Sequence, residues 1–95
     1  MDKNEIAEKK RRVKILQTQL GQLGPVMRGS VVRIGTRNKQ FYFSLNKDKK
    51  THLIYLGDKR VDRAREYSDN YKRLLEIVEE MTIITMELLK EDVPL

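Results

Sequence analysis

The chain has 95 residues, a formal net charge of +6 and no cysteine. Its length predicts one domain, and the absence of thiols excludes disulfides, thiolate catalysis and Cys-type zinc sites. No stretch approaches the roughly 20 apolar residues of a membrane span, and the charged N-terminus lacks the apolar core of a signal peptide, so we expect a cytoplasmic protein.

The charge is divided unevenly along the chain. Residues 1–73 hold 19 basic and 8 acidic residues, whereas residues 74–95 hold 1 basic and 6 acidic residues. A basic body with an acidic C-terminal end favours a polyanionic partner for the body. The alternative is a solvated surface that is rich in ion pairs.

A helix is predicted from about residue 4 to residue 23. Its apolar residues recur at spacings of 7, 3, 4 and 3, which is the pattern of a coiled-coil seam. They are Ile6, Val13, Leu16, Leu20 and Leu23. Lys9 takes the intermediate seam position, and the run "KKRRVK" covers the outer face. The glycine–proline pair at residues 24–25 ends the helix.

Three strands are predicted next, as an antiparallel meander. The segments "SVVRI" (30–34), "QFYFSLN" (40–46) and "THLIYL" (51–56) have the β-branched and aromatic residues typical of strands. A tight turn with Asp48 and Lys49 at its centre joins the second strand to the third, and this turn sets the register between them.

The two faces of this meander are expected to differ, because side chains alternate along a strand. The predicted core face carries Phe41, Phe43, Ile54 and Leu56, with Phe43 opposite Ile54. The opposite face carries Gln40, Tyr42, Ser44, Asn46, Thr51, Leu53 and Tyr55, with Tyr42 opposite Tyr55. Arg33 joins this second face if Val32 and Ile34 point inward.

A long helix is predicted over residues 59–90, with Asp58 as its N-cap and residues 91–95 as a tail. Eight positions step by 3 and 4 without a break. They are Ala64, Tyr67, Tyr71, Leu74, Val78, Met81, Thr85 and Leu88. Flanking apolar residues widen the stripe, which suits packing on more than one neighbour. The fold class is therefore α+β, with the Phe41 face of the meander packed on the helices.

The residue types argue against an enzyme, a metal site or a bound cofactor. The single histidine, His52, has no second histidine and no cysteine with which to build a metal cluster. The carboxylates recur at spacings typical of an exposed helix face, which does not favour a catalytic carboxylate pair. No glycine-rich phosphate loop is present.

Nucleic-acid binding, with DNA as the favoured partner, is the function that the meander indicates. Residues 28–60 hold nine basic and two acidic residues. Basic side chains at turns neutralise phosphates. An exposed sheet face contacts the edges of nucleobases in a groove or stacks on unpaired nucleobases. The predicted contact residues are Arg28, Arg33, Arg37, Lys39, Tyr42, Ser44, Lys47, Lys49, Lys50, Tyr55, Lys59 and Arg60. For the two tyrosines, the alternative is an ordinary cross-strand aromatic pair.

The competing interpretation is an interaction module built from the helices. The predicted seam residues are Val13, Leu16, Leu20, Tyr71, Leu74, Val78, Met81 and Leu88. They can form an intramolecular helix pair that is plain core, a homodimer, or a surface of the long helix for a protein partner. A homodimer is compatible with DNA binding, because two-fold symmetry would present two basic sheets.

Three segments, "MRGSVVRI", "FYFSLNKDKKTHLIYLG" and "YKRLLEIVEEMTIITMELL", resemble a family of small archaeal and bacterial proteins that brings no known activity. The resemblance covers about residues 27–89. That family usually carries a cysteine cluster between its first two strands, and this chain has "GTRNK" there, so no metal role is implied. The stretch "KTHLIYLGDKRVDRAREYSDNYKRL" is similar to the last strand and helix of the arm-type DNA-binding domain of tyrosine recombinases. In those domains the sheet sits in the major groove, which implies DNA binding by analogy.

Overall fold

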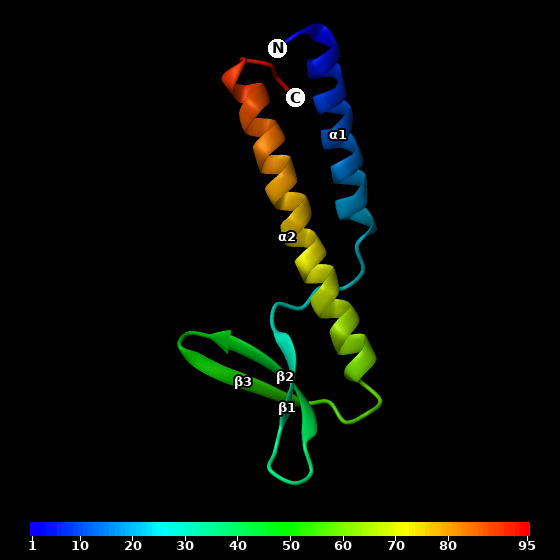
Figure 1. Cartoon of the computed structure of the whole chain (residues 1–95), viewed down its shortest axis with the longest axis vertical. Coiled ribbons are helices and arrows are strands. Elements are labelled where there is room, and N and C mark those ends of the chain that lie inside the picture. The colour runs from blue at the N-terminus through cyan, green and yellow to red at the C-terminus, as the bar shows by residue number, and fades with distance from the viewer. The chain divides into compact units, whose positions relative to one another are not determined.

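The computed structural model describes residues 1–95 and confirms the α+β arrangement. The elements follow in the order α1 (Lys3–Gln22), β1 (Ser30–Ile34), β2 (Gln40–Lys47), β3 (Lys50–Tyr55) and α2 (Val61–Lys90), as Figure 1 shows. The chain forms two compact units. One joins residues 1–23 to residues 73–95, and the other consists of residues 24–72. Helix α2 contributes to both.

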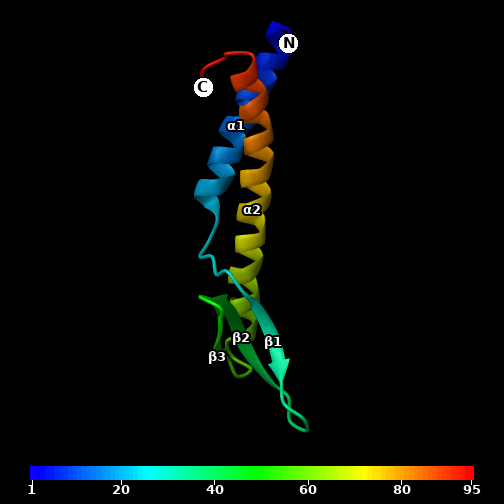
Figure 2. The same ribbon diagram turned by 90° about the vertical axis from the view of Figure 1, so that its left-hand side faces the viewer.

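The first unit is a hairpin in which α1 lies beside the C-terminal part of α2 (Figures 1 and 2). Helix α1 begins after Asp2, whose carboxylate accepts a hydrogen bond from the Glu5 N–H at 2.8 Å. Such a cap satisfies one of the free donors at a helix start. The buried residues of the hairpin are only Val13, Leu16, Ile77 and Leu88.

The packed stripe of α2 differs from the predicted seam. Its buried and half-buried apolar residues in the hairpin are Leu74, Ile77, Met81, Ile84 and Leu88. Val78 was predicted for the seam, but it is 48% exposed, and Leu20 of α1 is exposed as well. Spacing alone cannot choose between Ile77 and Val78, because both lie three or four residues from Leu74 and from Met81. Tyr71 belongs to the other unit and is half-buried.

Two ion pairs join the helices of the hairpin. The Lys9 ammonium contacts the Glu87 carboxylate, and the Arg12 guanidinium donates through Nε and Nη2 to both oxygens of Glu80, at 3.0 and 2.9 Å. This two-pronged hydrogen bond holds the pKa of Glu80 below its usual range, because it favours the ionised carboxylate. Part of the basic run of α1 is therefore paired within the chain.

Acid should weaken the hairpin through Glu80. Its lowered pKa means that the ionised form stabilises the folded state at neutral pH, and this contribution is lost as the pH falls below the ordinary glutamate value of about 4.3. We expect the Tm to fall more steeply below that pH in the wild type than in Glu80→Gln, as followed by circular dichroism. Glu79→Gln removes an exposed carboxylate without an ion pair and should keep the wild-type slope. Identical slopes for Glu80→Gln and the wild type would contradict the pairing.

The second unit is the sheet, in the order β1-β2-β3, packed on the first turns of α2. Tyr42 lies opposite Tyr55, and Phe43 lies opposite Ile54, so the predicted register is confirmed. Asp48 and Lys49 have φ angles of 54° and 61°. Positive φ at both central residues is the requirement of a two-residue type I′ hairpin turn, so the predicted turn is confirmed too.

The ring of Phe43 is at the centre of the core of this unit. It is buried with Leu56, Val61 and Ala64, so the Phe41 face packs on α2 as predicted. Ile54 was predicted for this core but is 56% exposed. The physical reason is that β3 is an edge strand whose every residue is exposed, and the first turns of α2 cover Phe43 rather than Ile54.

Helix α2 begins at Val61, later than the sequence predicts. The Ala64 N–H donates to the Arg60 carbonyl at 3.0 Å. Because the N-cap residue is the one whose carbonyl accepts the first bond of the helix, Arg60 takes that position instead of Asp58.

Two glycine substitutions, one in each unit, should change the free energy of unfolding in opposite directions. Gly29 has φ of 143°, and a Cβ on it would lie 2.5 Å from the Ser44 carbonyl oxygen and 2.8 Å from the Phe43 ring. We expect Gly29→Ala to lower the free energy of unfolding by about 1–3 kcal/mol. Gly21 lies inside α1 with open space around it, so Gly21→Ala should raise that free energy by about 0.5–1 kcal/mol. Urea titrations measure both, and a Gly29→Ala variant as stable as the wild type would contradict the close approach.

Candidate nucleic-acid interface

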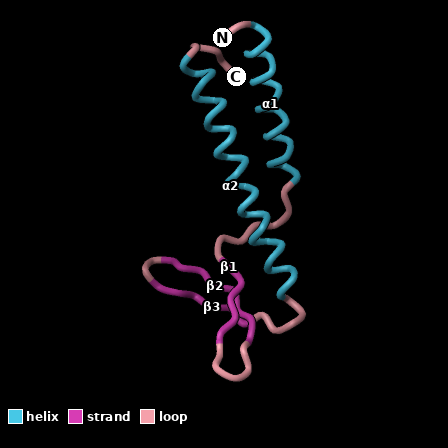
Figure 3. The backbone as a smooth tube through the Cα atoms, in the orientation of Figure 1, coloured by secondary structure: helices cyan, strands magenta, loops and turns pink.

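The sheet consists of two ribbons that share the middle of β2. Strand β1 pairs with residues 40–44 and β3 pairs with residues 42–47, so only Tyr42, Phe43 and Ser44 have a neighbour on both sides. Each ribbon continues past this overlap and ends in an exposed turn, and the two turns point in different directions (Figure 3). A two-stranded ribbon is narrow enough to enter the major groove of B-DNA.

Basic residues gather at the ends of both ribbons. Lys47, Lys49 and Lys50, which we call the basic tip, surround the β2–β3 turn, and Arg37 and Lys39 lie in the β1–β2 turn. All nine basic residues between positions 28 and 60 are exposed, and none of them forms a salt bridge. An ion-pair-rich surface therefore describes the helical hairpin but not this part of the chain.

Two of these arginines are held by backbone carbonyls. Arg28 donates through Nη1 to the Asn46 carbonyl at 3.0 Å, and Arg60 donates through Nε to the Leu56 carbonyl at 2.9 Å. Each guanidinium has five N–H donors, so one such bond orients it and leaves the others free. Lys59, next to Arg60, is exposed without a partner.

The structure places Arg33 on the face opposite to the expected one. It pairs with Phe41 in the ladder, so Val31 and Arg33 share the Phe41 face, and Val32 and Ile34 lie on the other. The Arg33 guanidinium lies 5.2 Å from the centroid of the Phe41 ring, and that of Arg65 lies 5.5 Å from it. A guanidinium over an aromatic ring is attracted to its electron-rich face. The alternation in "SVVRI" is ambiguous, because an apolar residue stands in both phases.

The face of the sheet opposite the Phe41 face, which we call the tyrosine face, carries no charged residue. Its members are Ser30, Val32, Ile34, Gln40, Tyr42, Ser44, Asn46, Thr51, Leu53 and Tyr55. The rings of Tyr42 and Tyr55 meet edge to face with centroids 5.6 Å apart, so the two tyrosines form a cross-strand aromatic pair. Tyr42 is half-buried in this pair, whereas Tyr55 is 50% exposed. Tyr55 therefore remains accessible to a partner while it packs on Tyr42.

Polar side chains of the tyrosine face are linked across the strands. The Thr51 hydroxyl donates to Asn46 Oδ1 at 2.9 Å, just behind the basic tip, and the Tyr55 hydroxyl donates to Gln40 Oε1 at 3.3 Å. Ser44 is half-buried between the two pairs. These bonds fix the amide orientations and leave the amide N–H groups of Asn46 and Gln40 as donors for base edges.

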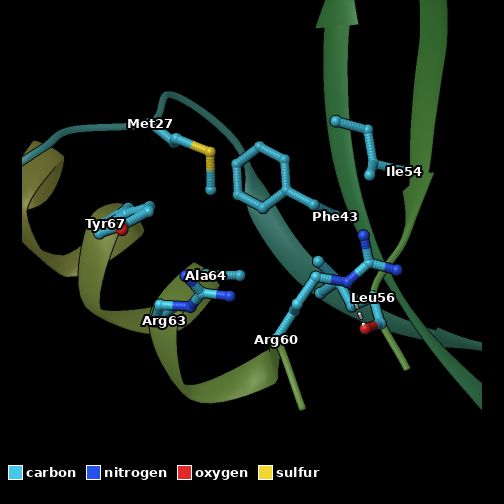
Figure 4. A pocket seen from close by; sticks show the side chains of 8 residues that line it. All are labelled: Met27, Phe43, Ile54, Leu56, Arg60, Arg63, Ala64 and Tyr67. Carbon is cyan, nitrogen blue, oxygen red and sulfur yellow. Dashed lines mark hydrogen bonds between the residues drawn. The ribbon is translucent and has the colours of Figure 1, made fainter. Parts of the chain in front are cut away.

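An apolar pocket opens beside the core of the same unit, on the Phe41 face (Figure 4). Met27, Phe43, Ile54, Leu56, Ala64 and Tyr67 form its walls, with Arg60 and Arg63 also lining it. Arg63 and Arg65 were not among the predicted contact residues. The spacing of Arg60 and Arg63 in "RVDR" is the signal that would have placed both on one side of a helix start.

Comparison with protein-family models, with curated proteins and with solved structures finds no match to this chain. Neither helix has the apolar length needed to cross a bilayer. No group of three or more histidine or carboxylate side chains comes together in a way that could hold a metal ion.

Arg33 should contribute to stability through the Phe41 ring. We expect Arg33→Ala to lower the free energy of unfolding by about 0.5–1 kcal/mol, the usual contribution of a cation–π contact near the surface. Arg37→Ala removes the same charge from an exposed turn and should leave stability within about 0.5 kcal/mol of the wild type. Urea titrations of the two variants compare them directly, and equal effects would argue against the ring contact.

Proposed function

We propose that this chain is a non-enzymatic nucleic-acid-binding protein, with DNA as the favoured partner. The observation that carries the proposal is the set of nine exposed basic residues without ion pairs, several of them at the turns that end the two ribbons. Arg33, Lys47 and Lys50 lie on the Phe41 face, and the opposite, tyrosine face carries no charge. Cations without an internal partner bind phosphates and release counterions at no cost in broken ion pairs. The basic residues supply affinity, and the tyrosine face supplies contacts to the bases.

The β2–β3 ribbon is the part that enters a duplex in this proposal. Its end is a tight two-residue turn, and the major groove, about 12 Å wide, admits a ribbon of two strands. The basic tip then lies among phosphates, and Asn46 and Thr51 follow it along the ribbon as the first polar side chains of the tyrosine face. The similarity to the arm-type domain of tyrosine recombinases supports the same placement by analogy.

A single-stranded nucleic acid would contact the tyrosine face in a different way. Tyr55 is exposed, and its ring is held by an edge-to-face contact with Tyr42, so it forms a preformed platform for an unpaired base. Stacking of a base on an aromatic side chain contributes about 1–3 kcal/mol. Tyr55→Ala should therefore weaken binding of a single strand far more than binding of a duplex.

Fluorescence anisotropy with a labelled duplex and a labelled single strand, titrated at several salt concentrations, tests the proposal. We expect binding that falls steeply as salt rises. The combined variant Lys47→Gln, Lys49→Gln and Lys50→Gln should lower the slope of log K against log salt by about 2.7 for a duplex, since each phosphate contact contributes about 0.9.

A matched variant separates a local contact from the effect of net charge. Lys3→Gln, Arg11→Gln and Lys14→Gln remove three charges from exposed positions of α1 that form no salt bridge. This variant has the same net charge as the tip variant and should keep most of the wild-type affinity. Equal losses in the two variants would contradict a role for the basic tip, and a wild type that binds neither probe at low salt would contradict the proposal as a whole.

A second candidate function is association of two chains through the helices. The observation that favours it is the exposure of large apolar side chains on α2 outside the hairpin core, with Val78, Met86 and Leu89 at 48%, 64% and 74%. Exposed apolar side chains that gather into one contiguous patch mark an interaction surface.

A further inference from the structure

Helix α2 carries two apolar stripes within the hairpin, and only one of them is covered. The covered stripe is Leu74, Ile77, Met81, Ile84 and Leu88, packed against α1. The open stripe is Leu75, Val78, Thr82, Thr85 and Leu89, with Met86 beside it. Both stripes step by 3 and 4, the spacing of a coiled-coil seam. A helix with two seams is typical of the centre of a helix bundle, where it packs on more than one neighbour.

The open stripe forms one wall of a groove in the hairpin. Leu20 of α1 forms the other wall. The α2 residues that line the groove are Val78, Met81, Thr82, Thr85, Met86 and Leu89, so Leu75 lies outside it. The groove is mainly apolar, and its α2 residues span positions 78–89, about three turns of the helix, so it offers an apolar surface along α2. The hairpin has few fully buried residues of its own, and a small core gains stability from such an added layer.

The open stripe is complementary to itself. Thr82 lies at its midpoint, with Leu75 and Leu89 seven residues to either side and Val78 and Met86 four residues to either side. A two-fold axis through Thr82 would therefore place Leu75 against Leu89 of a second copy, and Val78 against its Met86, in an antiparallel pair of α2 helices. An interface in which one patch meets its own copy is the requirement of a closed dimer.

The division of charge between the helices favours the same arrangement. Residues 3–22 carry six basic and two acidic residues, whereas residues 73–95 carry six acidic and two basic residues. A second α2 in the groove would bring its acids beside the basic residues of α1 on one side and beside the acids of the first α2 on the other. In the antiparallel pair, Arg73 of one copy would lie level with Glu91 of the other, because both positions are nine residues from Thr82. Packing α1 against α1 would bring like charges together instead.

We propose that two copies of this chain form an antiparallel dimer in which the open stripe of each α2 fills the groove of the other hairpin. The interface is built on Leu75, Val78, Met86 and Leu89, with Thr82 on the two-fold axis. The inference rests on the second candidate function and specifies its surface. It also moves the interface away from Leu88, a predicted seam residue that is fully buried inside the hairpin.

Sedimentation equilibrium tests the surface with matched substitutions. The wild type should sediment at twice its chain mass of 11.3 kDa at micromolar concentration. The double variant Val78→Gln and Leu89→Gln should sediment as a monomer with unchanged helical circular dichroism, because both side chains are exposed within the single chain. Ile83→Gln changes a side chain about as exposed as Val78 but outside the groove, and it should leave the dimer intact.

The outcomes distinguish an error in the proposed surface from an error in the proposal that the chain associates at all. A monomeric wild type overturns both the dimer and the second candidate function. A wild-type dimer that the double variant does not weaken leaves association standing and shows that this surface is wrong. Dissociation of the Ile83→Gln control to the same extent also overturns the surface.

Single cysteines test the symmetry, because the chain has none of its own. Thr82→Cys should form an intermolecular disulfide readily on mild oxidation, since the two thiols meet at the axis and a disulfide needs Cα atoms within about 7 Å. Leu75→Cys should not, because the antiparallel pair separates its two copies by about 21 Å along the helices. Rapid crosslinking of Leu75→Cys would indicate a parallel pair and overturn the proposed arrangement.

Discussion

Burial of the Phe43 ring against the first turns of α2 determines which side of the sheet is available to a partner. The ring is buried with Val61 and Ala64 of α2 and with Leu56, which directly follows β3. Because side chains alternate along a strand, a slip of one residue would exchange the two faces of the sheet. The same contact that builds the core therefore leaves the tyrosine face uncovered and free of charge.

The chain uses its basic residues in two ways. In the helical hairpin, Lys9 and Arg12 are paired with acids of α2 and hold two helices together. In the unit that holds the sheet, the basic residues between positions 28 and 60 have no acidic partner. Arg28 and Arg60 donate to carbonyl oxygens, and Arg33 lies over an aromatic ring. Sequence composition counts both groups alike, and only the spatial arrangement shows that one is structural and the other is free to bind an anion.

Much of the fold could be predicted because its signals are local. The residues at the centre of the β2–β3 turn fixed the strand register, and the length of the two helices followed from their apolar spacing. The face of Arg33, the exposure of Ile54 and the choice of Ile77 over Val78 could not be predicted, because each depends on which neighbour covers a position. In the candidate interface, too, local features could be predicted and packing contacts could not. Its basic turns were visible in the sequence, whereas the ring contact of Arg33 depends on the face that β1 presents and that of Arg65 on the packing of α2 against the sheet.

The overlap of the two ribbons over three residues of β2 has a consequence for motion. Beyond Ser44, the β2–β3 ribbon has no third strand, and every residue of β3 is exposed. Segments with few buried contacts open locally at a small fraction of the free energy of global unfolding. The end of the ribbon should therefore open at a lower free energy than the core around Phe43, and it is the part of the sheet best able to adapt to a curved partner surface.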